Sequence, residues 1–171
     1  MAQHISPYHA PNFYADSLAK GRHRDIVGGR WDETGRAQMA LLLDEGLLPD
    51  HHLLDIGAGS LRLGCKAVPY LDPGHYWATD LSGALMRQGH AVELADPTRL
   101  PAGHLIEDAS FDFPRIPDTI THAIAFAVFF LFVLHKHIVP YLHEPSAIAV
   151  LVTCFTECKI MFFAGIVKDL R

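Results

Sequence analysis

Two acidic residues and a pair of glycines have the types and the spacing that could hold a small ligand. Asp55 lies at the end of a short apolar run and is followed by Gly57, Ala58 and Gly59. Glycines at such a turn let the backbone bend sharply and come close to a ligand. Asp80 follows Gly59 by 21 residues, which is where a doubly wound fold places a carboxylate for ribose hydroxyls. The pattern therefore predicts a nucleoside-binding site.

Two classes of nucleoside ligand fit this pattern. A dinucleotide carries a pyrophosphate, and its fingerprint has a third glycine where this chain has Arg62, the next glycine being Gly64. S-adenosylmethionine carries an adenine, a ribose and a cationic amino-acid tail. Asp55 would complement the ammonium of that tail directly or through water. The residue types favour the methyl donor, and a nicotinamide dinucleotide stays open as an alternative.

The surrounding sequence alternates strand and helix patterns, as expected for an α/β domain with a doubly wound, mostly parallel sheet and helices on both faces. Apolar spacing predicts a helix over 33–47, capped by Asp32 or Thr34 and ending near Gly46. Further helices are expected between the strands, over 60–70 and over 82–88, the latter capped by Ser82. The predicted strands are 53–57, 75–79, 104–108, 120–130 and 147–155.

Three ordered motifs carry a resemblance to a known family. They are VGGRWD at 27–32, LDIGAGSLRLG at 54–64 and YLDPGHYWATDLSGALMRQG at 70–89. Together they resemble class I S-adenosylmethionine-dependent methyltransferases, and most of all a bacterial subgroup with the pattern VGGxWDxxG, LLDIGCGSLRGG and YYGIDI. The resemblance covers about 22–112 and implies a Rossmann-like methyltransferase fold, here without its last strands.

The resemblance also implies roles for individual residues. Asp55, Gly57 and Gly59 would line the methionine end of S-adenosylmethionine, Asp80 would bind the ribose hydroxyls, and Asp108 would contact the adenine. The cofactor-binding set implied in this way is Asp55, Gly57, Ala58, Gly59, Asp80, Leu81, Asp108 and Ala109.

The last third of the sequence departs from this family. Where relatives carry a polar AQSVFTHL-like stretch, this chain has Phe126 and Ala127 at the Gln and Ser positions. No catalytic residue is therefore assigned, although His122 lies near a family active-site position and could act as a base if it is not a core histidine. One domain is expected over 1–171. It would comprise an N-terminal extension (1–30), a cofactor-binding half (31–118) and a divergent apolar part (119–171).

Composition narrows the classes of partner. The net charge is −5, from 14 Lys and Arg against 19 Asp and Glu, which argues against nucleic acid. The apolar run 123–134 is shorter than the roughly 18–20 residues of a membrane span, and Glu157 and Lys159 interrupt the next apolar run, 148–167. No targeting segment is recognised at the start of the chain. A small-molecule or saccharide acceptor is expected by family analogy.

Cysteine and histidine usage gives two more expectations. Three cysteines do not make a disulfide framework, so reduced thiols and the cytoplasm are expected. The twelve histidines lack metal-ligand spacing, His51 and His52 should point to opposite faces, and no metal is predicted. Arg62 and Arg87 are expected to be solvated helix residues. Trp31, Tyr76 and Trp77 are interpreted as packing residues.

An alternative from another class of function stays open. An incomplete sheet would leave an edge strand and apolar surface that need cover. The chain would then be a cofactor-binding but inactive fragment that associates with another chain, including another copy of itself.

Overall fold

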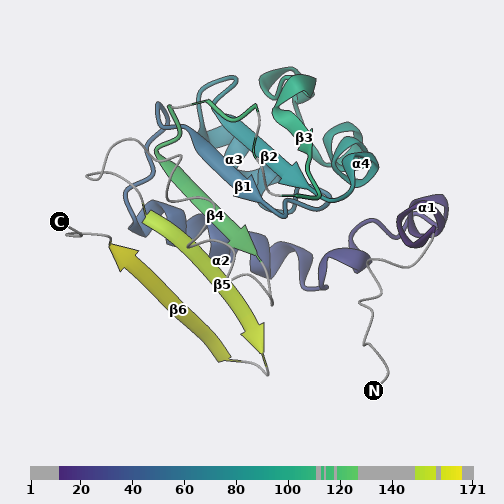
Figure 1. Ribbon diagram of the computed structural model, residues 1–171, viewed down its shortest axis with the longest axis horizontal. Helices are drawn as coiled ribbons and strands as arrows, with labels where there is room; N and C mark the ends of the chain where they lie inside the picture. The colour runs from purple at the N-terminus through teal and green to yellow at the C-terminus, as the bar shows by residue number, and fades with distance from the viewer. Residues whose placement is uncertain are drawn as a thin grey trace.

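A single six-stranded sheet organises the protein in the computed structural model, which describes residues 12–110, 113, 115–117, 119–126, 149–156 and 159–166 (Figure 1). The strand order is β3-β2-β1-β4-β5-β6. The strands are β1 (Leu53–Ile56), β2 (Tyr76–Asp80), β3 (Leu105–Glu107), β4 (His122–Phe126), β5 (Ala149–Thr156) and β6 (Lys159–Ile166).

The first five strands run parallel, which confirms the doubly wound, mostly parallel sheet predicted from the sequence. In the central register Leu53 of β1 lies between Tyr76 of β2 and His122 of β4. The order reverses direction at β1, where the chain moves first to β2 and β3 and later to β4. Open α/β sheets bind ligands at such a switch point, beyond the carboxyl ends of the strands.

The strand β6 runs antiparallel to β5, with Thr156 paired to Lys159. The apolar run 148–167 therefore contributes two strands, while residues 127–134 of the run 123–134 lie outside the described residues. Within the described part of the chain, no helix has the length and the apolar character needed to cross a bilayer.

The described part of the chain has four α-helices between and before its strands: α1 (Phe13–Ala19), α2 (Trp31–Asp44), α3 (Gly64–Tyr70) and α4 (Gly83–Glu93). Short 3₁₀ segments occur at Asp25–Val27, Pro97–Arg99 and Ala102–His104. Ser82 caps α4 as predicted, its Oγ accepting from the Leu85 N–H at 3.2 Å. The predicted caps of α2 are wrong, because that helix begins at Trp31 after Arg30 and has no side-chain cap.

Alternation along the strands divides the core between the two faces of the sheet. On one face Leu53, Tyr76 and Ala78 pack with residues of α2, α3 and α4. On the other face Leu54 and Ile56 pack with another group of apolar residues: Phe113, Ile120, Ala123 and Ala125. The described helices α2, α3 and α4 thus cover the first face.

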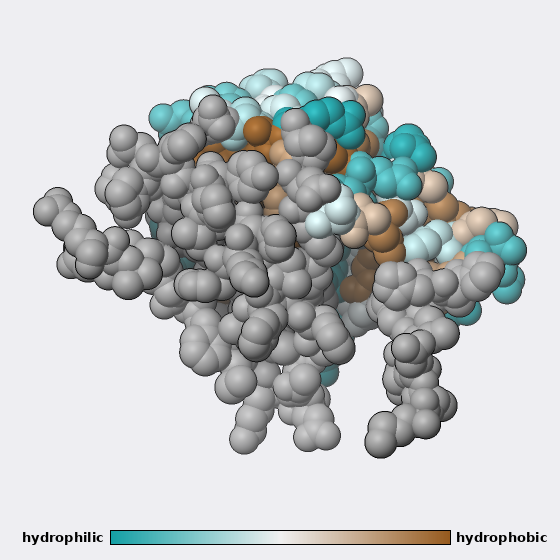
Figure 2. Space-filling view, in the orientation of Figure 1, coloured by the Kyte–Doolittle hydropathy of each residue, from teal (hydrophilic) through white to brown (hydrophobic). Residues whose placement is uncertain are grey.

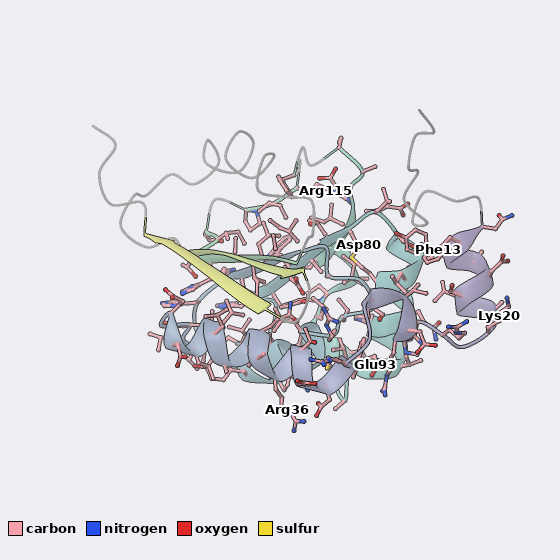
Figure 3. All side chains as sticks on the ribbon, turned by 90° about the horizontal axis from the view of Figure 1, so that it is seen from below. Phe13, Lys20, Arg36, Asp80, Glu93 and Arg115 are labelled. Atoms are coloured by element: carbon pink, nitrogen blue, oxygen red, sulfur yellow. The ribbon has the colours of Figure 1, made fainter. Side chains whose placement is uncertain are left out.

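The figures agree with this division. Figure 3 shows Arg36 and Glu93 on the helical side of the sheet and Arg115 on the other side, with Asp80 between them. In Figure 2, hydrophilic residues form the outer rim of the described part of the molecule, and hydrophobic residues show inside that rim.

Histidines gather at the amino-terminal edge of the sheet. The rings of His52 and His75 stack with centroids 4.0 Å apart, and those of His51 and His122 stack at 5.0 Å. His104 stacks on Trp77 at 3.5 Å. His51 and His52 thus have different stacking partners. Among the described residues no group of three or more His, Cys, Asp or Glu is arranged to hold a metal ion.

This arrangement predicts a loss of stability in mild acid. Burial lowers the pKa of His52, and the neighbouring His75 and His104 lower it further. The folded state then binds fewer protons than the unfolded chain, so this contribution is complete above pH 6.5 and is lost as pH falls below it. His52→Phe, which keeps a stacked ring without a charge, should show a smaller fall in thermal midpoint between pH 7.5 and 5.5 than the parent. Equal falls in both proteins would contradict the prediction.

Candidate functional site

The loop after β1 and the end of β2 are tied together at the carboxyl-terminal edge of the sheet. The Gly57 and Ala58 N–H groups donate to the Thr79 carbonyl at 2.8 and 3.0 Å. The Gly59 N–H donates to Asp80 Oδ2 at 2.9 Å, and the Ser82 N–H donates to Asp80 Oδ1 at 2.9 Å. Each Asp80 oxygen thus accepts one of these backbone bonds, and a carboxylate oxygen has lone-pair capacity for more.

The half-buried position of Asp80 affects its charge. Burial raises the pKa of Asp80, whereas the N–H groups of Ser82 and Gly59 lower it. These N–H groups stabilise the ionised form of Asp80. The glycine loop that it bonds is exposed at Gly57.

Asp55 lies beneath this loop and is 2% exposed. Its Oδ2 accepts the Tyr76 hydroxyl at 2.5 Å. Burial raises the pKa of Asp55 to about 7, while the Tyr76 hydrogen bond and Arg62 lower it and Asp80 raises it. Asp55 and Asp80 are therefore close enough to influence one another, as a shared site requires.

Asp108 organises the third turn at the same edge, directly after β3. Its N–H donates to the Asp80 carbonyl at 3.0 Å. Its Oδ1 accepts from the Ser110 N–H at 2.9 Å, and its Oδ2 accepts from the Phe113 N–H at 3.0 Å. Asp108 is buried and Ala109 beside it is exposed. The carboxylate thus shapes the loop on which the resemblance places the adenine contact.

The glycine loop is longer than its local sequence suggests. The helix expected from Ser60 begins only at Gly64, because the chain keeps turning and Leu61 has a φ of 63°. Gly57 and Gly59 have φ values of 76° and 57°, a region that favours glycine. A Cβ on Gly59 would also lie 2.5 Å from Val27 Cγ1. Both glycines are therefore required by the backbone that the site needs.

The segment before α2 is bonded to this loop. Ser60 Oγ donates to the His23 carbonyl at 2.9 Å. Arg62 Nη1 donates to the carbonyls of Val27 at 2.8 Å and Gly29 at 3.3 Å. Arg62 is 5% exposed, so the prediction of a solvated arginine is wrong. Its carbonyl partners lie about 35 residues upstream, which local spacing does not reveal.

His122, the candidate base, lies away from the carboxyl-terminal edge of the sheet. His122 is the first residue of β4 and pairs in register with Leu53, at the amino-terminal end of the sheet. Burial lowers its pKa, and its ring stacks on His51. Four residues of strand, about 13 Å, separate its level in the sheet from the glycine loop at Gly57, so it does not act as a base there.

The remaining predicted residues lie together. The loop 57–59 is bonded to β2 at Thr79 and Asp80, half-buried Leu81 continues from Asp80, and Asp108 is bonded to the Asp80 carbonyl. Tyr76 packs in the core, as interpreted from the sequence, and its hydroxyl in addition donates to Asp55. The signal for it was the register, since Tyr76 pairs with Leu53 and thus shares a face with Asp55 two residues later.

The acidic residues at this edge of the sheet suit a positively charged nucleoside. Asp55 of β1, Asp80 of β2 and Asp108 of the turn after β3 all lie at this edge of the sheet. A pyrophosphate would be repelled by these acids, whereas a sulfonium and an ammonium would be attracted.

Comparison with known proteins identifies the fold. No protein-family model matches the sequence. A precorrin-6y C5,15-methyltransferase from Geobacter metallireducens GS-15 is similar in structure, with a TM-score of 0.52 and 18% identity over 69% of this chain. The match covers 62% of the Geobacter protein, so this chain spans less than two thirds of it.

A second solved protein is similar over more of this chain. Magnesium protoporphyrin IX methyltransferase (ChlM) from Synechocystis PCC 6803, solved with bound SAM, matches with a TM-score of 0.53 and 14% identity over 94% of this chain and 81% of its own. Its structure with bound SAH matches with a TM-score of 0.52 and 16% identity over 82% and 68%. The chain has the Rossmann-like fold of class I S-adenosylmethionine-dependent methyltransferases.

Proposed function

We propose that the protein binds S-adenosylmethionine at the carboxyl edge of β1, β2 and β3 and transfers its methyl group to a small-molecule acceptor. The observation that carries this proposal is the hydrogen bond from the Gly59 N–H to Asp80, which joins the glycine loop to the second acid of the motif. Structural similarity to ChlM with bound SAM supports the same ligand class.

The residues at this edge fit the parts of the cofactor. Asp80 would accept the ribose hydroxyls with the lone pairs that Gly59 and Ser82 leave over. The glycine loop would lie against the methionine part, with the buried Asp55 acting on the ammonium through its charge. Leu81 and the turn formed by Asp108 and Ala109 would lie against the adenine.

Methyl transfer requires few catalytic groups from the protein. The cofactor supplies a methyl group on a positively charged sulfur, which an acceptor atom displaces in line. The protein's task is to align donor and acceptor and to exclude water, with a base only where the acceptor must lose a proton. The acceptors in the names of the similar proteins are tetrapyrrole-related, and for this chain we propose only the class of small molecules.

Calorimetric titration tests the ligand class directly. S-adenosylmethionine and S-adenosylhomocysteine should both release or absorb binding heat, and NAD should give none. Incubation of the bound protein with a metabolite pool should then yield a methylated product. Heat from NAD alone would contradict the proposal and favour the dinucleotide alternative. Binding without any methylated product would favour the inactive fragment.

Asp80→Ala is expected to weaken S-adenosylmethionine binding by about 1–3 kcal/mol, because ribose hydroxyls would lose their acceptor. The variant also removes the acceptor of the Gly59 N–H, so the loop loses its tie to β2. The affinity is measured by calorimetry. Asp72→Ala, on the exposed turn after α3, is the control and should bind as the parent does. Unchanged affinity in Asp80→Ala would remove this residue from the site.

A further inference from the structure

A tyrosine that no motif includes lies under the site and bonds the first acid of the motif. Tyr76 begins β2, and its hydroxyl donates to Asp55 Oδ2 at 2.5 Å. Tyr76 is 1% exposed and Asp55 is 2% exposed, so water does not compete for this bond. A hydrogen bond to a charged group in such surroundings is stronger than one between neutral groups.

The surrounding residues leave space for this hydroxyl. A Cβ on Gly64, the first residue of α3, would lie 3.1 Å from the Tyr76 hydroxyl oxygen and 2.9 Å from Leu61 Cβ. A larger residue at 64 would therefore press on the tyrosine. The start of α3, the glycine loop and β2 thus together hold the phenol against the carboxylate.

We propose that Tyr76 is a positioning residue that favours the ionised form of Asp55 and fixes the orientation of its carboxylate for the cationic end of S-adenosylmethionine. This inference rests on the proposed function and adds a residue to it. Tyr76 does not touch the cofactor and acts through Asp55.

The charges around the pair define what the tyrosine does. Three groups act on the Asp55 carboxylate. They are the Tyr76 hydroxyl on β2, Arg62 in the loop after β1, and Asp80 at the end of β2. Burial disfavours the carboxylate and Asp80 adds to this, whereas Tyr76 and Arg62 favour it. Burial also raises the pKa of Tyr76 well above 10, as do Asp55 and Cys65, so the phenol stays a donor at neutral pH.

This balance gives cofactor affinity a definite pH dependence. A cationic ligand favours ionised Asp55, so binding should strengthen as pH rises through the pKa of about 7. Between pH 6 and pH 8 the affinity should rise about tenfold through this group. Removing the phenol hydroxyl removes a bond to the charged form, and the midpoint should move upward by about one pH unit.

The test compares Tyr76→Phe with the parent by calorimetric titration with S-adenosylmethionine from pH 6 to pH 9. At pH 7 the variant should bind about fivefold more weakly, and at pH 9 the two should bind alike, because Asp55 is then ionised in both. A merely structural role would weaken binding equally at every pH. Equal loss at pH 7 and pH 9 would therefore overturn the proposal.

Two further variants complete the experiment. Tyr70→Phe removes a hydroxyl that donates to the Leu47 carbonyl at 2.9 Å, away from Asp55, and should leave the midpoint unchanged. In Asp55→Asn the pH dependence should disappear, and adding Tyr76→Phe should not restore it. A persisting midpoint near 7 in Asp55→Asn would overturn the proposal.

A measurement without ligand separates this inference from the proposed function. The carboxyl carbon of Asp55, followed by NMR in the ligand-free protein, should titrate at higher pH in Tyr76→Phe than in the parent. If the parent binds no S-adenosylmethionine, the proposed function fails. If the parent binds and the Asp55 titration does not move in Tyr76→Phe, the tyrosine inference fails while the proposed function stands.

Discussion

Asp55→Asn should make the fold more stable at pH 8 and the protein a poorer binder of S-adenosylmethionine. Burial raises the pKa of Asp55 from 3.8 to about 7, so the folded state binds more protons than the unfolded chain between these values. Stability from this group is therefore present in acid and is lost as pH rises through 7, by up to about 4 kcal/mol.

Asparagine keeps the shape and an acceptor for the Tyr76 hydroxyl but adds a buried amide donor. That donor offsets part of the gain, so the expected net increase in unfolding free energy is about 1–3 kcal/mol at pH 8 and less at pH 5. Urea unfolding at both pH values measures it. Asp72→Asn, an exposed substitution, should show no such difference. A variant less stable than the parent at pH 8 would mean that the ionised Asp55 carboxylate does not lower the free energy of unfolding.

Gly89→Ala should destabilise the protein, although alanine is the better helix former. A Cβ at 89 would overlap the carbonyl group of Ser60, which is backbone and cannot turn aside. An ordinary helix glycine gains about 1 kcal/mol on this change, whereas overpacking here should cost about 3 kcal/mol. In a chain of this length the thermal midpoint should fall by about 5–10 °C.

The same substitution should weaken cofactor binding, because Ser60 belongs to the loop that carries Gly59. Thermal unfolding and calorimetry on one preparation measure both effects. Gly103→Ala is the control, since nothing lies within 4 Å of a Cβ there. A midpoint equal to or above that of the parent would show that α4 can move away from the loop.

The sequence predicted the parts of the sheet where local pattern and register agree. The apolar run before Gly57 became β1, and the β-rich run before Asp80 became β2, each within one residue of its expected start. Ser82 and Gly46 acted as predicted at the ends of their helices. These features depend on near neighbours in the chain, which a single sequence displays.

Features that depend on distant partners could not be predicted in this way. Leu61 takes a left-handed conformation inside a segment with helical spacing, and Arg62 is buried against carbonyls far upstream. The helix α1 lies in a part of the sequence without apolar periodicity and packs beside α4. In each case the tertiary contact outweighs local preference.

The candidate site shows the same difference. Asp55, Gly59 and Asp80 were recognised from type and spacing, and the structure brings them to one edge. Tyr76 lacked a motif, and only the pairing of β1 with β2 places it on the face that Asp55 occupies. Predicting the contact between Tyr76 and Asp55 would have required the register of β1 against β2, which a single sequence does not reveal.

The bonds from Arg62 to the carbonyls of Val27 and Gly29 bear on where the protein can be cut. A shortened chain beginning at Trp31 would keep every cofactor motif after β1 but lose two acceptors of a buried guanidinium and the Val27 side chain that packs on Gly59. Val27 and Gly29 therefore support the glycine loop from below, and a shortened protein should retain them if that loop is to keep its conformation.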